Sequence, residues 1–259
     1  MKKKNIAIIV LSVLLIAATA AAGIMGTMLL RPEEDAFETV RLADRVWDDY
    51  MSTCSWIGCN PQYDLSGEDT SPSVGEVIRC VYVESFDESR PKDYPLAENE
   101  RFSPSCAYVY DICIYNNGSG YLHYQQWGTI HTVEVGYWEY EGETREMTTT
   151  IGWRSVLYAE STVELTAEEI NGIFAVMERH DYGHIPTENP SMYTGMDGDT
   201  TFLVYTSSLI DPHADWMGHM ISAWCAEAGS PCYEIRKAIE ELVIAHNAGP
   251  IPQNAKKVN

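Results

Sequence analysis

The sequence predicts an α+β fold: an antiparallel β-meander packed with two C-terminal helices and preceded by an N-terminal transmembrane helix. Three observations lead to this prediction. An uncharged stretch runs from Ile6 to Leu30, residues 106–161 alternate in the manner of β-strands, and two later segments have helical periodicity. A meander followed by a helix, a hairpin and a second helix is typical of α+β domains.

Residues 1–30 predict a signal anchor or a signal peptide. Lysines at positions 2–4 precede the uncharged run, which is long enough to cross a hydrocarbon core of roughly 30 Å. The lysines favour a cytoplasmic N-terminus, so the remainder lies outside the cytoplasm as the domain of a single-pass cell-membrane protein. Small residues at Ala18, Ala20 and Ala22 also fit a cleavage site, and cleavage would make the protein secreted. We favour the anchor because cleavage leaves an apolar mature N-terminus.

The rest of the chain divides into four predicted regions. Residues 31–53 have helical periodicity and are expected to form a stalk or a packing helix. Residues 54–103 are rich in loop-forming residues, with one strand expected at 76–84. Residues 104–248 form the α+β extracytoplasmic domain, and residues 249–259 are expected to be a disordered tail.

The extracytoplasmic domain is expected to hold two hairpins, a closing strand, a later strand pair and two helices. Thr166 and Glu169 fit a capping box for one helix, and Ser230 with Pro231 begins the other. Asn117 lies in the first hairpin turn, where Asn117-Gly118-Ser119 also fits an N-glycosylation acceptor. The expected strands cover residues 107–115, 121–127, 132–140, 145–151, 154–159, 201–206 and 217–224.

The chain is strongly acidic, with a formal net charge of −21. Phosphate binding needs the opposite sign, so nucleic acid is excluded as a partner. A dispersed, solvated acidic surface explains this composition, while cation binding and adaptation to high salt are the alternatives. The expected partners are the membrane, through the N-terminal helix, and another envelope protein or polymer.

Seven cysteines in an oxidising compartment predict disulfides, with at least one thiol left over. The pairs closest in sequence, Cys54 with Cys59 and Cys225 with Cys232, are the disulfide candidates. Cys106 and Cys113 lie seven residues apart on one expected strand, which places them on opposite faces. Zinc knuckles of the C-x-x-C type do not occur.

The order of elements resembles a family of uncharacterised domains found in secreted and lipid-anchored proteins. The resemblance rests on the strand at 108–115 with its glycine turn, the helix opening Leu165-Thr166-Ala167-Glu168-Glu169, and the strand pair ending at Trp224 before Pro231. It covers roughly residues 104–246. It implies an extracytoplasmic α+β domain and no particular activity. The added region before residue 104 and the long strands near 130–152 depart from it.

Catalytic and cofactor motifs are missing: G-x-S-x-G, P-loop and G-x-G-x-x-G patterns do not occur. We therefore expect no cofactor. One candidate for a metal site remains, in which histidines and an aspartate near the ends of two elements supply nitrogen and oxygen ligands. Its residues are His180, His184, His213, Asp215 and His219. Such loop histidines are more often solvated or locally hydrogen-bonded.

Aromatic residues follow the expected strands closely. If exposed, they form a platform for a protein or carbohydrate; otherwise alternate members form the core of a sheet with one wet side. They are Tyr82, Tyr108, Tyr110, Tyr115, Tyr121, Tyr124, Trp127, Tyr137, Trp138 and Tyr140. The sequence thus favours a non-enzymatic binding or interaction module of the cell envelope, acting through these aromatics or the 86–105 loop. The alternative is a metal-dependent hydrolase that uses the histidines at 180–219.

Overall fold

The computed structural model describes residues 46–59, 74–85, 94–140, 142–185, 198–207 and 219–252 of the chain. Within these residues the protein forms six strands, three α-helices and one short 3₁₀ helix. The α+β class is therefore confirmed. The predicted anchor at residues 1–30 lies outside the described residues, and in the described part no helix is both long and apolar enough to cross a membrane.

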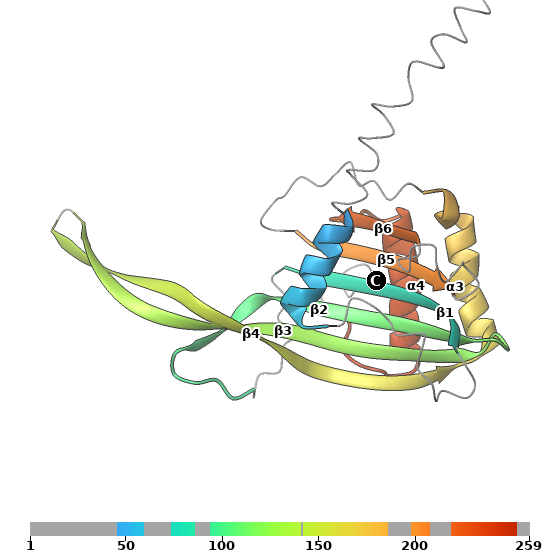
Figure 1. The fold of residues 1–259 in the computed structure, drawn as a ribbon, viewed down its shortest axis with the longest axis horizontal. Helices are drawn as coiled ribbons and strands as arrows, with labels where there is room; N and C mark the ends of the chain where they lie inside the picture. The colour runs from blue at the N-terminus through green and yellow to red at the C-terminus, as the bar shows by residue number, and fades with distance from the viewer. Residues whose placement is uncertain are drawn as a thin grey trace, which may run out of the picture. The chain divides into compact units, whose positions relative to one another are not determined.

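All six strands belong to one antiparallel sheet, with the order β4-β3-β2-β1-β5-β6 (Figure 1). The strand predicted at 76–84 is the central β1. The separate strands predicted at 145–151 and 154–159 are one continuous strand, β4. The strands are β1 (Val74–Glu84), β2 (Glu100–Tyr115), β3 (Gly120–Tyr140), β4 (Glu143–Leu165), β5 (Thr200–Ser207) and β6 (His219–Trp224).

One helix follows β4 and another follows β6, as expected. Helix α3 (Ala167–Arg179) begins with the predicted capping box, in which Thr166 and Glu169 exchange hydrogen bonds. A 3₁₀ turn, η1 (Tyr182–His184), comes after it. Helix α4 (Pro231–Ala245) has Ser230 as its N-cap. The capping box therefore marked the start of α3, and the N-cap serine followed by proline marked the start of α4.

A third helix covers residues 46–57 and continues past residue 53, where a loop-rich region was expected. Tyr50, Cys54 and Ile57 recur at helical spacing and are fully buried, which explains why the helix extends. Its end is tied to the sheet edge, because the Ser155 hydroxyl in β4 donates to the Trp56 carbonyl at 2.8 Å.

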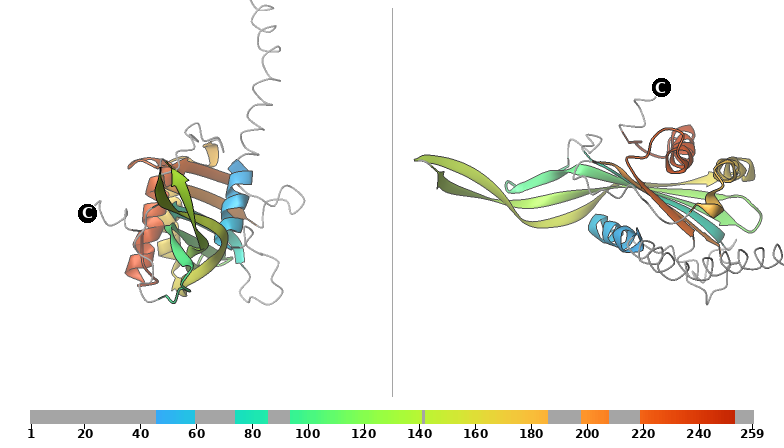
Figure 2. Two further views of the ribbon diagram at one scale, coloured as in Figure 1. Left: turned by 90° about the vertical axis from the view of Figure 1, so that its left-hand side faces the viewer. Right: turned by 90° about the horizontal axis from the view of Figure 1, so that it is seen from above.

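The sheet is covered on both faces (Figure 2). Helices α3 and α4 pack on one face and helix 46–57 packs on the other. Adjacent residues of β1 show the alternation, since Cys80 joins the α4 side of the core and Val81 the helix 46–57 side. Cys106 and Cys113 lie in different clusters, on opposite faces as predicted.

The segment after α4 returns to the sheet. The Ser161 hydroxyl donates to the Ala248 carbonyl, and the Tyr124 hydroxyl donates to the Pro250 carbonyl at 2.7 Å. A Cβ at Gly249 would lie 2.3 Å from the Tyr124 ring, so this close approach requires glycine. Residues 253–259, the rest of the predicted tail, lie outside the described residues.

The core beneath α4 contains an ion pair. Arg236 donates to Glu240 at 3.0 Å, and its guanidinium lies 3.9 Å from the centroid of the Tyr82 ring. Both charged residues are buried. Burial outweighs the attraction of Arg236 and raises the pKa of Glu240 to about 7. In the part of the chain that the structure describes, the Tyr110 hydroxyl and Arg236 Nε have no hydrogen-bond partner.

The raised pKa of Glu240 predicts a loss of stability with rising pH. Below about pH 4.5 the carboxyl is protonated in both the folded and the unfolded chain; above it the unfolded chain ionises first, so folding stability falls until about pH 7. A shift of this size corresponds to roughly 3 kcal/mol. Urea unfolding at pH 4.5 and 7.5 should show that Glu240→Gln loses less stability than the wild type. Its exposed neighbour serves as the control in Glu241→Gln, and equal pH dependence in both variants would contradict the prediction.

Candidate functional site

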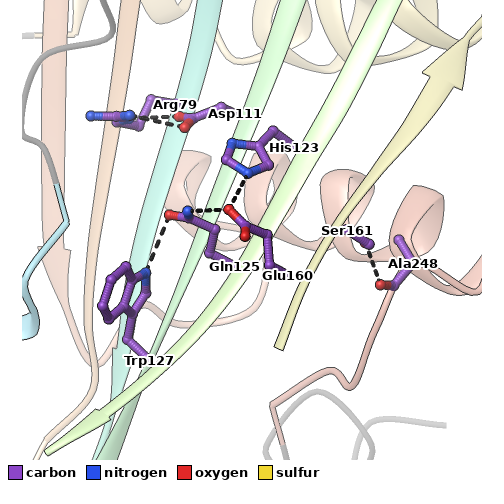
Figure 3. Close-up of polar contacts among 8 residues, drawn as sticks. All are labelled: Arg79, Asp111, His123, Gln125, Trp127, Glu160, Ser161 and Ala248. Carbon is purple, nitrogen blue, oxygen red and sulfur yellow. Dashed lines mark hydrogen bonds and ion pairs between the residues drawn. The ribbon is translucent and has the colours of Figure 1, made fainter. Parts of the chain in front are cut away.

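A row of polar side chains crosses the sheet on the face covered by helix 46–57. Arg79 in β1 lies opposite Asp111 in β2, which lies opposite His123 in β3 (Figure 3). Arg79 donates to both carboxylate oxygens of Asp111, from Nε at 2.6 Å and from Nη2 at 2.9 Å. The bidentate geometry is the strongest form of such a pair.

The inner half of this row is closed to solvent. Arg79 and Asp111 are both buried, and Arg79 Nη1 also donates to the Tyr50 hydroxyl of helix 46–57 at 3.4 Å. Burial alone would lower the pKa of Arg79, but the Asp111 carboxylate and the Tyr50 hydroxyl together outweigh burial, and the pKa is raised. The pair therefore ties helix 46–57 to the central strands.

The outer half of the row is open to solvent. The Glu160 carboxylate in β4 contacts His123 Nε2 and accepts from Gln125 Nε2, both at 2.9 Å (Figure 3). Trp127 Nε1 donates to Gln125 Oε1 at 3.2 Å. The Gln125 amide and then His123 lower the pKa of Glu160, although nearly half of its side chain is exposed. The described residues contain no group of three or more His, Cys, Asp or Glu that could hold a metal ion.

Two cysteines lie next to the buried charges. Cys54 and Cys59 are buried between helix 46–57 and the sheet, and their thiols hydrogen-bond each other. This contact lowers the pKa of Cys54 and raises that of Cys59. Gly58, with a φ of +82°, makes the turn that brings Cys59 back.

All seven cysteines fall within the described segments and are free thiols. Cys225 is exposed and Cys232 is buried at the start of α4. Disulfides between Cys54 and Cys59 and between Cys225 and Cys232 stay predictions. The contact between the first two thiols makes that pair the better candidate.

The histidines proposed as metal ligands do not converge in the described residues. His184 is exposed and contacts Asp181 at 2.6 Å, while His219 contacts the Tyr182 carbonyl at 2.9 Å and packs edge-on against that ring. His180 is the C-cap of α3. The remaining candidates, His213 and Asp215, lie outside the described residues. The hydrolase alternative stays a prediction.

Asn117 occupies an exposed turn between β2 and β3. Its side-chain oxygen accepts from the Ser119 backbone amide at 3.0 Å and from the Ser119 hydroxyl at 2.9 Å. Gly118 has a φ of +84°, which suits glycine in this turn. Glycosylation at Asn117 stays a prediction.

The hairpin of β3 and β4 continues beyond the rest of the sheet. The last β2–β3 pair is Glu100 with Thr132, whereas β3 and β4 stay paired out to Tyr140 with Glu143. Residues 133–153, which we call the arm, project away from the helices (Figure 1). On the other side of β3, the Val133 amide donates to the Asn99 carbonyl at 2.8 Å, and beyond Val133 no described residue pairs with the β3 strand of the arm.

The arm exposes a dense set of large apolar side chains. Tyr137 is 71% exposed, and Trp138 and Tyr140 lie with ring centroids 5.5 Å apart. Of the ten exposed large hydrophobic residues among those described, seven belong to the arm: Val135, Tyr137, Trp138, Tyr140, Met147, Ile151 and Trp153. The arm is therefore the main exposed apolar surface of the described part of the chain.

The aromatic residues predicted along the sheet differ in burial, and three of them, Tyr115, Tyr121 and Trp127, are partly buried on the face of helix 46–57. Tyr82, Tyr108, Tyr110 and Tyr124 are buried in the core under α3 and α4. Tyr137, Trp138 and Tyr140 are exposed on the arm. A signal for the exposed group existed in the sequence, because Tyr137 and Trp138 are adjacent and point to opposite faces, whereas a sheet with one wet side buries only one face.

Comparison with protein-family models, curated proteins and solved structures finds no match to this chain. The resemblance to secreted and lipid-anchored domains therefore stays an expectation. The function is argued below from the geometry of the chain itself.

The Arg79–Asp111 pair predicts a large asymmetry between single and double substitutions. Asp111→Ala leaves a buried guanidinium without its counter-ion and should cost about 3–5 kcal/mol of unfolding free energy. Arg79→Met combined with Asp111→Leu should recover most of this loss. Urea unfolding measures both. The exposed pair Arg145–Glu143 is the control, where Glu143→Ala should change stability by less than about 1 kcal/mol. A double variant no more stable than Asp111→Ala would contradict the prediction.

Oxidising expression should join Cys54 and Cys59. A bridge removes both thiol hydrogens, so intact mass and peptide mapping of the non-reduced protein will detect it. Cys54→Ser should leave the Cys59 thiol free, whereas Cys80→Ser, which removes another buried cysteine, should leave the bridge intact. Recovery of Cys54 and Cys59 as thiols after such expression would rule the bridge out.

Proposed function

We propose that this protein is a membrane-anchored binding module whose extracytoplasmic domain engages another envelope protein or polymer through the arm. The uncharged run at residues 6–30 supports the anchor. The exposed aromatic and aliphatic side chains of the arm carry the proposal of binding. Tyr and Trp are the residue types that most often dominate protein interfaces.

The arm is not needed to complete the core. The buried clusters on the two faces of the sheet contain no residue between Glu134 and Trp153. Exposed apolar surface of this extent is unfavourable in water and is rare on proteins that act alone. A partner that covers these side chains accounts for their presence on a projecting hairpin.

The arm also has the shape that recognition requires. Its two strands expose side chains on both faces, and its rings are held on a paired β-hairpin rather than on an irregular loop. Rigid aromatic side chains lose little conformational entropy on binding. The paired hairpin of the arm therefore presents a fixed aromatic surface to the partner.

Site-specific photocrosslinking tests this function. We expect p-benzoylphenylalanine in place of Tyr137 to give a discrete adduct when the full chain is expressed in its native envelope. The matched control replaces Ile244, an exposed apolar residue of α4 that lies outside the arm, and should give no such adduct. The same pattern from both positions, or no adduct at Tyr137, would contradict the proposal.

A further inference from the structure

We propose that one face of the arm is a docking surface for an arginine-bearing segment of a partner protein, with Tyr137, Glu139 and Glu146 receiving the guanidinium. This inference rests on the proposed function and names the chemistry of its partner. Tyr137 lies opposite Glu146 in the β3–β4 register, and Glu139 is two residues along the same strand. All three side chains therefore share one face and are exposed.

The chain itself shows how it holds arginine elsewhere. On the other face of the arm, the Arg145 guanidinium lies 5.7 Å from the centroid of the Tyr140 ring and contacts Glu143 at 3.3 Å. Tyr140 and Glu143 are directly opposite in the register, as Tyr137 and Glu146 are. The two faces thus repeat one Tyr–Glu arrangement, and one of them carries an arginine.

Two further sites in the body repeat the chemistry. Arg154 lies 5.9 Å from the Tyr94 ring centroid and contacts Glu100 at 3.0 Å. Arg236 lies 3.9 Å from the Tyr82 ring centroid and contacts Glu240 at 3.0 Å. An aromatic ring and a carboxylate together hold a guanidinium through its π-face attraction and an ion pair.

The face of Tyr137 has the acceptors without the cation. Within the described residues, Glu139 and Glu146 form no ion pair, and the arm contains Arg145 as its single basic residue, already held by Glu143 and Tyr140. Val135, on the same face, is also exposed and supplies apolar contact beside the ring. Charge complementarity therefore favours a partner that alternates arginine with apolar residues.

A second copy of this chain is a poor occupant. The chain has a net charge of −21, and the arm itself carries five glutamates, Glu134, Glu139, Glu141, Glu143 and Glu146. Two arms face to face would bring these carboxylates together, which is unfavourable. An anionic lipid surface is disfavoured for the same reason.

The test measures binding of a labelled peptide of alternating arginine and valine to the full chain in detergent, by fluorescence anisotropy. The control peptide replaces each arginine with citrulline, which keeps the shape and removes the charge. We expect the citrulline peptide to bind at least about tenfold more weakly, and the arginine peptide to weaken with added salt. Equal binding of both peptides would overturn the proposal.

Variants locate the site on one face. Glu146→Gln and Tyr137→Leu should each weaken the arginine peptide about threefold. Glu134→Gln removes the same charge from the opposite face of the arm and should leave affinity unchanged. If Glu134→Gln and Glu146→Gln act equally, the attraction is diffuse and the assigned site is wrong. Concentration-dependent dimers abolished by Tyr137→Leu would assign the surface to a second copy and also overturn it.

The two proposals fail in different ways. A discrete photocrosslinked adduct at Tyr137, combined with equal binding of the arginine and citrulline peptides, leaves the binding module standing and removes its arginine preference. Absence of both the adduct and peptide binding removes both.

Discussion

The bidentate contact between Arg79 and Asp111 lies at the centre of the sheet, on neighbouring central strands, with almost no exposure to water. Two charges in such a place are stable only while both stay paired and covered. Helix 46–57 provides the cover, and its Tyr50 hydroxyl accepts a hydrogen bond from Arg79 Nη1. The pair therefore makes this helix a required layer of the fold rather than a separate stalk.

A second buried pair constrains the opposite face. Arg236 and Glu240 belong to α4 and lie against Tyr82 of β1. One face of β1 thus carries the Arg79–Asp111 ion pair. On the other face, the Arg236 guanidinium of α4 lies over the Tyr82 ring. With both faces covered, the described strands that form the body have no large apolar surface left for a partner. The exposed apolar side chains are instead concentrated on the arm, where β3 and β4 extend beyond their pairing with β2.

Local signals in the sequence predicted the elements well. Thr166, Glu169, Ser230 and Pro231 marked both helix starts, because capping chemistry depends on a few adjacent residues. Helix 46–57 was cut short because Ser52 and Gly58 favour a loop, while burial of Tyr50 and Cys54 against a distant sheet decides the outcome. The polar row was missed for the same reason. Arg79, Asp111 and Glu160 are far apart in sequence, and only strand register brings them onto one face.

On the arm, the acidic residues oppose aggregation of the exposed apolar side chains. A long hairpin with exposed Tyr, Trp, Val and Ile side chains and unpaired edges is a template for aggregation. Carboxylates interspersed among those side chains repel a second arm and keep the surface soluble. In the proposed docking the same carboxylates select a cationic partner, so a single arrangement of Tyr137, Glu139 and Glu146 would both oppose self-association and favour arginine. Protection and specificity on this surface are therefore two effects of one charge pattern.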